Sequence, residues 1–387
     1  MSRIEELLKE FCPDGVEYKT LGDVAELARG NGMPKADLTD IGVGAIHYGQ
    51  IYTHYGTWAN STISFVNQEK ASRLVKVNPG DLIVTNTSEN IEDVCKTVAW
   101  LGSSRIVTGG HATVIRHHMN PKYLSYWFQS PEFFNQKKRF ATGTKVIDVS
   151  AKQLAKIRVP VPPLPVQEEI VRILDSFTSL EAELEAELEA RKKQYEYYRA
   201  ELLSNYEDTV MRLGDVFDMG AGTHISASVI SDTPNETQCY PCFGGNGIRG
   251  YVDKFTHNND AVFIGRQGAL CGNVHRTSGK FYATEHAVVV TPKIKVDMAW
   301  AFHKLTQMDL NQFKTKSAQP GLAVVRIKEL TFTLPPLSEQ HRIVSILDKF
   351  DSLVNDLSSG LPAEIAARRK QYEYYRDRLL TFKELTV

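Results

Sequence analysis

Two long stretches of the chain carry apolar residues in alternating steps of four and three, which is the spacing of a helical seam. In the first stretch these residues are Ile170, Leu174, Phe177, Leu184, Leu188, Tyr195, Tyr198 and Leu202. In the second they are Ile343, Leu347, Phe350, Val354, Leu357, Leu361, Ile365, Tyr372, Tyr375 and Leu379. Charged residues fill the other faces, so the pattern predicts two helices that pack on one another as a coiled coil. Packing of each helix against its own domain is the alternative. An extra step of four in the second stripe, at Gly360 and Pro362, predicts a kink or break.

Between these helices the pattern changes to short apolar runs separated by glycine-rich turns, which is typical of strands. Residues 81–84, 113–116, 261–264 and 286–290 are predicted strands. Residues 122–139 and 298–316 are predicted helices. The two globular blocks are therefore expected to be mixed α and β domains, in the α+β class.

The sequence also repeats itself. RKKQYEYYR at 191–199 recurs as RRKQYEYYR at 368–376, and LGDV at 21–24 recurs at 213–216. The repeat spans about half the chain, which indicates duplication of a whole domain with its helix. The predicted segments are an N-terminal helix and lead-in (1–17), a first domain (18–160), a first helical region (161–209), a second domain (210–334) and a second helical region (335–387). In this alternating order the two helices would lie antiparallel and hold the two domains apart.

Charge and cysteine content narrow the function classes. The net charge is only -1, but Lys and Arg outnumber Asp and Glu in 18–160 and 210–334, whereas acidic residues dominate 161–209. Basic blocks separated by an acidic helix favour nucleic-acid binding by the domains. The five scattered cysteines do not form a disulfide framework, and Cys239 and Cys242 lack a second pair at zinc-finger spacing. With no apolar run long enough to span a membrane, we expect a soluble cytoplasmic protein without a membrane partner.

The repeated segments resemble a known family. PPLPVQEEIVRILD and PPLSEQHRIVSILD, followed by RKKQYEYYR and RRKQYEYYR, are similar to the two conserved regions of specificity subunits of type I restriction and modification systems. VMRLGDVFDMGAGTH and GGNGIRGYVDKF resemble the target recognition domains of that family. The resemblance covers nearly the whole chain. It implies two recognition domains, each reading one half of a split, asymmetric site in double-stranded DNA. It also implies that the helices carry two methyltransferase subunits and, through them, restriction subunits.

Two features depart from symmetry. The first helical region is four residues shorter than the second, measured from the PPL leucine to the shared lysine. A Leu-Glu-Ala-Glu repeat at 180–190 occurs in the first helix only.

Enzyme motifs are incomplete. The two Pro-Pro pairs follow Val161 and Leu334, which cannot accept hydrogen bonds from a target amine as Asn or Asp would. GxGxxG at 245–250 precedes a strand-like segment, which predicts a close-packed turn rather than a phosphate site, and no GKS or GKT loop occurs. We therefore predict a non-catalytic chain without cofactor or metal, and expect S-adenosylmethionine, ATP and Mg on partner subunits. A methyltransferase with unrecognised cofactor motifs and a coiled-coil scaffold without DNA contact are the alternatives.

Polar loops in both domains supply candidate base-reading groups, because the base edges of the major groove differ in donors and acceptors. In the first domain the candidates are His47, Tyr48, Gln50, Tyr52, Asn86, Thr87, Ser88, His111, Thr142, Gly143, Thr144 and Lys145. In the second they are Asn246, Arg249, Arg266, Gln267, Thr284, His286, Lys316, Ser317 and Gln319. A solvated turn is the alternative for each. The strongest candidates are Arg266 with Gln267, and residues 142–145.

The repeated tyrosines of the helices, Tyr195, Tyr197, Tyr198, Tyr372, Tyr374 and Tyr375, are predicted to make seam and partner contacts. Because they lie on helices, base stacking is the less favoured interpretation.

Overall fold

The computed structural model describes residues 3–204, 209–268, 270–315 and 320–385. The chain divides into two compact units: unit 1 is Met1–Glu183 with Ala366–Val387, and unit 2 is Leu184–Ile365. Each unit therefore holds one globular block with parts of both helical regions. Among the described residues, no helix is long and apolar enough to cross a membrane. The ranges predicted for the five segments stay predictions.

Unit 1 is built on two sheets. A five-stranded sheet has the order β2 (Ala25–Arg29), β11 (Ala112–His117), β7 (Leu82–Thr85), β9 (Thr97–Trp100) and β4 (Trp58–Ala59). A four-stranded sheet has the order β5 (Ser64–Val66), β3 (Val43–Ile46), β10 (Ile106–Thr108) and β6 (Val75–Val77). Two strand pairs complete the unit, β1 (Tyr18–Thr20) with β13 (Arg158–Pro160) and β8 (Thr87–Ser88) with β12 (Ile147–Asp148). The short helices are α1 (Arg3–Phe11), α2 (Leu21–Val24), α3 (Tyr48–Thr53), α4 (Gln68–Arg73), α5 (Pro121–Trp127), α6 (Pro131–Phe140) and α7 (Ala151–Leu154), with a 3-10 turn at Lys35–Asp37.

Unit 2 repeats this arrangement, except that its first sheet has four strands and no counterpart of β4 among the described residues. Its first sheet has the order β15 (Phe217–Ala221), β22 (Ala287–Pro292), β19 (Ala261–Gly265) and β20 (Val274–Thr277). Its second has the order β17 (Gly247–Val252), β16 (Tyr240–Gly244), β21 (Lys280–Ala283) and β18 (His257–Asn258). In each unit the central pair of the second sheet is parallel, β3 with β10 and β16 with β21. The remaining elements are the pair β14 (Val210–Arg212) with β23 (Thr331–Thr333), the helices α9 (Leu213–Val216), α10 (Met298–Gln307) and α11 (Val324–Lys328), and 3-10 turns at Ala227–Val229 and Leu310–Phe313.

The predicted strands are confirmed as β7, β11, β19 and β22. Every residue of β7 is buried, because Leu82 and Val84 face one core cluster and Ile83 faces another. A strand covered on both faces shows a continuous apolar run instead of alternation, which matches the observed sequence pattern.

The predicted helices of the globular blocks are shorter than expected. Residues 122–139 form two helices, because Ser130 caps α6 through the backbone N–H of Phe133, and Pro131 occupies its first turn. In unit 2, α10 ends at Gln307 because Asp309 adopts a left-handed conformation with φ 44°. A 3-10 turn follows where helix was predicted.

Three long helices carry the two seam patterns: α8 (Leu164–Ser204), α12 (Leu337–Asn355) and α13 (Leu361–Leu379). In unit 1, Phe177 stacks on Tyr375 with ring centroids 5.5 Å apart. Glu181, one turn later on α8, pairs with Arg369, which is earlier on α13. The two helices are therefore antiparallel there.

Unit 2 forms its own part of the seam. Tyr195 and Tyr198 of α8 stack on Phe350 of α12, with ring centroids 6.2 and 5.5 Å apart. The expected break lies between α12 and α13, where Leu357 is 83% exposed. Leu357 is thus not a seam residue, which corrects the predicted stripe, because the helix has already ended at Asn355.

A repeated glutamine joins each globular block to its long helix. Gln167 of α8 and Gln340 of α12 are both buried. Each donates from Nε2 to the proline carbonyl five residues earlier, at 2.7 and 2.8 Å. Each also accepts, through Oε1, the backbone N–H of the residue that caps the domain helix, Asn120 for α5 and Asp297 for α10, at 2.8 and 2.9 Å. The PPL segments therefore serve as the start of the long helices.

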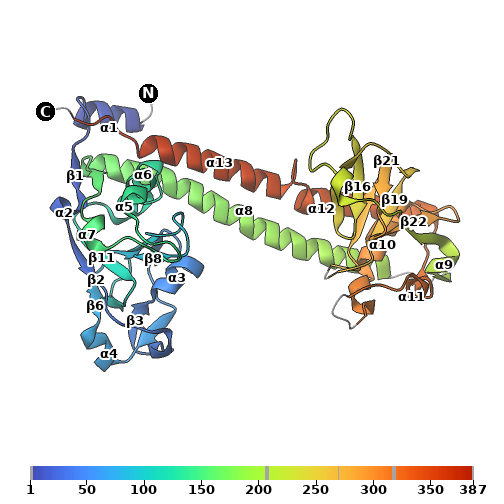
Figure 1. Ribbon diagram of the computed structural model, residues 1–387, viewed down its shortest axis with the longest axis horizontal. Coiled ribbons are helices and arrows are strands. Elements are labelled where there is room, and N and C mark those ends of the chain that lie inside the picture. The colour runs from blue at the N-terminus through green and yellow to red at the C-terminus, as the bar shows by residue number, and fades with distance from the viewer. Residues whose placement is uncertain (1–2, 205–208, 269, 316–319, 386–387) are drawn as a thin grey trace. The chain divides into compact units, whose positions relative to one another are not determined.

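A repeated aspartate makes the second attachment. In unit 1, Asp175 of α8 accepts from the hydroxyl of Tyr126 at 2.7 Å and pairs with Lys122 at 2.6 Å, so that α5 lies against α8 (Figure 1). In unit 2, Asp348 of α12 is 2.8 Å from Nε2 of His303 on α10. Gln167 and Asp175 form the unit 1 anchor, and Gln340 and Asp348 form the unit 2 anchor.

The unit 2 anchor continues into a polar network. The hydroxyl of Tyr195 lies 3.1 Å from Nδ1 of His303, and Arg276 pairs with Asp348 at 2.7 Å and with Asp351 at 3.2 Å. His303 is fully buried, and this burial lowers its pKa despite the nearby carboxylate of Asp348. The imidazole therefore stays neutral at pH 7 and holds α10 to both long helices of unit 2.

Replacing Asp348 with alanine is expected to weaken the attachment of α10. The change leaves His303 without its Nε2 acceptor, at a cost of about 1–2 kcal/mol, because a buried polar group loses its partner. Hydrogen exchange of the α10 amides should accelerate by roughly tenfold. Lys349→Ala, at the neighbouring exposed position of α12, should leave that rate nearly unchanged. Equal rates in the two variants would contradict this role of Asp348.

Candidate nucleic-acid interface

Two loops that are distant in sequence meet at one end of the main sheet in unit 1. The segment after β7 contributes Asn86 and Thr87, the latter at the start of β8, and the loop before β11 contributes His111. The backbone N–H of Asn86 donates to the carbonyl of His111 at 2.8 Å, and Oγ1 of Thr87 lies 3.1 Å from Nδ1 of His111. His111 is exposed and adopts φ 64°, and the ring of Tyr48 lies 5.0 Å from its imidazole.

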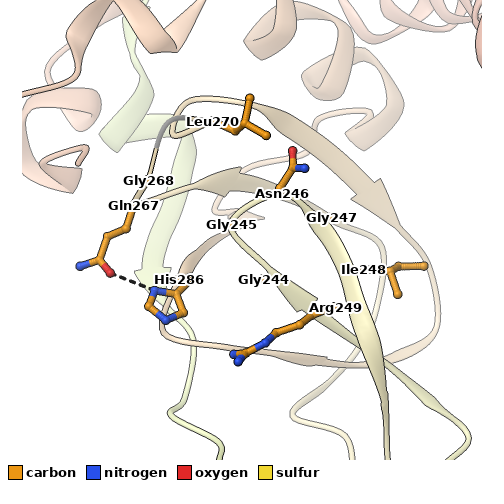
Figure 2. A pocket seen from close by; sticks show the side chains of 10 residues that line it. All are labelled: Gly244, Gly245, Asn246, Gly247, Ile248, Arg249, Gln267, Gly268, Leu270 and His286. Atoms are coloured by element: carbon orange, nitrogen blue, oxygen red, sulfur yellow. Dashed lines mark hydrogen bonds between the residues drawn. The ribbon is translucent and has the colours of Figure 1, made fainter. Parts of the chain in front are cut away.

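Unit 2 contains the same arrangement. The loop after β19 contributes Arg266 and Gln267, and the loop before β22 contributes His286. The backbone N–H of Arg266 donates to the carbonyl of His286 at 2.9 Å, and Nδ1 of His286 lies 2.9 Å from Oε1 of Gln267 (Figure 2). Gln267 and His286 line a pocket of about 590 Å³ with Asn246 and Arg249. The corresponding pocket of unit 1 measures about 680 Å³ and includes His47, Tyr48 and His111.

A third loop adjoins the pair in unit 1. Thr142 exchanges backbone hydrogen bonds with Asp148 at 2.9 and 2.8 Å, and β12 then pairs with β8, which holds Thr87 and Ser88. Gly143, Thr144 and Lys145 are exposed between these points. The candidate loop 142–145 therefore lies next to the histidine site.

In unit 2, the counterpart begins beyond the described residues. Gly321 forms a bridge with Gln267, and Gly268 donates its N–H to the carbonyl of Pro320 at 2.9 Å. The candidates Lys316, Ser317 and Gln319 lie outside the described residues.

Four of the candidates support the site instead of facing outward, which corrects their predicted placement. Asn86 is fully buried, with its amide bonded to Val149 and Thr113, and Thr284 is fully buried as well. The amide of Gln50 bonds Ser64 and the backbone of His47. Tyr52 donates its hydroxyl to the Thr87 carbonyl at 2.9 Å, and burial raises its pKa to about 12. Asn86, Gln50 and Tyr52 fix the loops, because their polar groups are already paired within the protein. The buried hydroxyl of Thr284 has no hydrogen-bond partner among the described residues.

The glycine-rich segment 245–250 forms the hairpin between β16 and β17, and no helix follows it. Gly247 at the turn has φ 88°, which favours glycine. A Cβ on Gly265 would lie 2.1 Å from the carbonyl oxygen of Gly245. The predicted turn with close backbone approach is confirmed, and it presents Asn246 and Arg249 on its exposed side.

Sequence reasoning missed His224 and Glu285. Nδ1 of His224 lies 2.8 Å from the Glu285 carboxylate, and Nε2 of His286 lies 3.4 Å from it. Burial raises the pKa of Glu285, but the hydrogen bond from His224 and the two imidazoles outweigh this effect and leave the pKa below its usual value. The sequence signal that could have identified Glu285 as a site residue was its position directly before the candidate His286.

The six candidate tyrosines lie on different faces of their helices. Tyr195 is buried, and Tyr198 and Tyr375 stack on phenylalanines of the seam. The ring of Tyr372 is tilted against Phe177, with centroids 6.5 Å apart. Tyr197 and Tyr374 are 63% and 59% exposed, on the outer faces of α8 and α13. Among the six candidate tyrosines these two are the most exposed.

No group of three or more His, Cys, Asp or Glu residues is placed to hold a metal within the described ranges. Cys239 is exposed and Cys242 is buried in β16. The predicted absence of a metal remains a prediction.

The family model of the type I restriction modification DNA specificity domain matches residues 13–190 and again 204–367. The chain belongs to this family. It is accordingly a specificity subunit with two recognition domains, and unit 1 and unit 2 each hold one of the two matched regions apart from short segments at the boundaries.

Curated relatives agree with this assignment. The chain is 44% identical over 297 residues to the EcoprrI specificity subunit of Escherichia coli, covering 73% of this chain and 74% of the relative. It is 34% identical over 292 residues to the EcoR124I/EcoR124II specificity subunit of Escherichia coli, covering 67% and 70%.

Solved structures show the same fold. The S subunit of a type I system from M. genitalium superposes with a TM-score of 0.59 at 13% identity, covering 95% of this chain and 96% of that one. A chain from a structural study of complex assembly and conformational transition in a type I system gives a TM-score of 0.65 at 16% identity, covering 95% and 98%.

Gly143→Ala is expected to disturb the 142–145 loop of the specificity subunit. Gly143 has φ 103°, and a Cβ there would lie 2.0 Å from the carbonyl oxygen of Val146. We expect roughly tenfold weaker binding to a preferred duplex, since the strain of about 1–2 kcal/mol moves the loop. Gly56→Ala in the same unit is the control, because a Cβ there meets nothing within 4 Å and Gly56 is not among the residues that line the unit 1 pocket. Equal binding of the two variants, measured by fluorescence anisotropy at one salt concentration, would show that the loop takes no part.

Proposed function

We propose that each unit of this specificity subunit reads one half of an asymmetric, bipartite DNA site through its histidine site and the loops beside it. The observation that carries this proposal is that the two units have the same backbone arrangement at this site but different side chains on it. Both units join the same two loops through a histidine, but the partner side chain is Thr87 in one and Gln267 in the other. Equivalent frames with different donors and acceptors suit two half-sites of different sequence.

Exposed cations beside these sites would bind the DNA backbone. Lys145 lies in the third loop of unit 1, and Arg249 lines the pocket of unit 2. Phosphate contacts from such groups position a protein on the duplex, while the side chains at the loop tips read the bases. Arg249 is also able to donate to guanine.

The long helices would hold the recognition domains at a fixed spacing and bind two methyltransferase subunits, which in turn bring the restriction subunits. Tyr197 and Tyr374 support this part of the proposal. They occupy equivalent positions of the repeat and are the most exposed of the repeated tyrosines. Exposed aromatic residues are enriched at protein interfaces.

In this proposal the chain performs no catalysis, and the partners hold S-adenosylmethionine, ATP and Mg. The structural role of the Pro-Pro motifs supports it, because they begin α8 and α12 and accept the amide of the anchor glutamine. Micromolar binding of S-adenosylmethionine by the isolated chain would favour the methyltransferase alternative. Equal binding of all duplexes would favour the scaffold alternative.

Exchanging one recognition domain tests the modular reading of DNA. A chimera that replaces residues 18–160 with the same block of another family member should change one half of the preferred site and leave the other unchanged. The matched chimera replaces residues 210–334 and should change the opposite half. Both sites can be determined by selecting bound duplexes from a random library. A chimera that alters both halves would contradict the assignment of one half-site to each unit.

The Leu-Glu-Ala-Glu repeat of α8 tests the spacing role. Four added helical residues lengthen the helix by about 6 Å and advance its stripe by about 40°. One extra unit after residue 183 should therefore preserve the seam and lengthen the unread spacer by one or two base pairs, at about 3.4 Å each. A two-residue insertion is the control and should impair assembly, since it rotates the seam residues away. An unchanged spacer in the four-residue variant, mapped by methylation, would show that α8 does not set the spacing.

A further inference from the structure

Unit 2 contains a chain of three side chains that ends at the exposed rim of its pocket. The carboxylate of Glu285 lies 3.4 Å from Nε2 of His286, and Nδ1 of His286 lies 2.9 Å from Oε1 of Gln267. Figure 2 shows the Gln267 amide with Oε1 directed at His286 and Nε2 directed away from it. Gln267 itself is exposed, whereas Glu285 is partly buried.

The chemistry of this chain fixes which nitrogen carries a proton. An amide oxygen only accepts hydrogen bonds, so Nδ1 of His286 must donate to Gln267. The carboxylate beside Nε2 also only accepts hydrogen bonds, so the ring satisfies Gln267 and Glu285 together when both of its nitrogens carry a proton. His224 and Arg266 complete the polar surroundings: His224 bonds Glu285 at 2.8 Å, and Arg266 donates to the Glu285 carbonyl at 3.4 Å. The histidine therefore presents a donor to Gln267.

The orientation of an exposed glutamine amide decides what it offers to DNA. With Oε1 held by His286, Nε2 projects as a donor toward an acceptor, such as N7 or O6 of a purine. The flipped amide would project Oε1, which suits the amino groups of adenine or cytosine. An amide locked in one orientation thus discriminates between base edges that a freely turning amide would accept alike.

In unit 1 a histidine joins the same two loops, but the orientation of its partner side chain is not fixed. His111 contacts the hydroxyl of Thr87, which can donate or accept by rotating. The residue before His111 is Gly110, so no carboxylate occupies the place of Glu285.

We propose that His286, held by Glu285, is a positioning residue that sets the amide orientation of Gln267 and thereby the base preferred at one position of the second half-site. This inference rests on the proposed DNA-reading function. It adds the residue that determines specificity, the atom that contacts the base, and the class of base edge that is chosen.

The test compares the duplexes that the full-length chain selects from a library randomised over both half-sites. His286→Lys offers only donors to Gln267 and should retain the original preference. His286→Asp places an acceptor there and should turn the amide. At one base pair of the second half-site, preference should then move by about tenfold from purine acceptor edges to amino-bearing edges. All other positions should stay unchanged.

Gln267→Glu gives an independent measurement if His286→Asp fails to fold. A carboxylate projects only acceptors, so the same base pair should show the same shift. His111→Asp is the matched control in unit 1, and it should leave the second half-site as it is. An unshifted preference in both His286→Asp and Gln267→Glu would overturn the inference, as would loss of preference in His286→Lys. The absence of any preferred sequence with the unaltered chain would instead overturn the proposed function, and the inference with it.

Discussion

Each recognition domain of this specificity subunit depends on two polar side chains of the long helix that follows it. A buried glutamine fixes the first turn of the domain helix, and an aspartate about two turns further along the long helix fixes the next turn of the domain helix. Both contacts are directional, so they set the angle and register of the attachment, which apolar packing alone would leave adjustable. Because the same pair occurs at Gln167 with Asp175 and at Gln340 with Asp348, the duplicated chain attaches both domains in the same way.

Because this attachment is the same in both units, the side chains of the loops at the end of each main sheet can differ between the units without changing how the domains are held. The backbone hydrogen bond between the two loops is the same in both units, at 2.8 and 2.9 Å. The side chains on that frame are not the same, because Asn86 turns inward to bond Val149 whereas Arg266 stays near the surface. A conserved frame with variable side chains is how one fold recognises different sequences.

The sequence alone predicted the duplication, the seam and four central strands, because each leaves a local or repeated pattern. It did not predict which polar loop residues face outward. Asn86 and Thr284 look like exposed loop residues, but each directly follows a buried strand and is drawn into the core. Nor could spacing show that Gln267 meets His286, since that contact depends on the pairing of β19 with β22. The break in residues 122–139 was missed because a Ser-Pro pair is compatible with either a cap or a kink.

The central claim is that the two units present equivalent sites to DNA. A structure of the full-length chain bound to its preferred duplex tests it most directly. The account predicts that Thr87 with His111, and Gln267 with His286, contact base edges in the major groove at corresponding positions of the two half-sites. Base contacts made by unrelated loops in the two units, with either histidine site facing solvent, would contradict it.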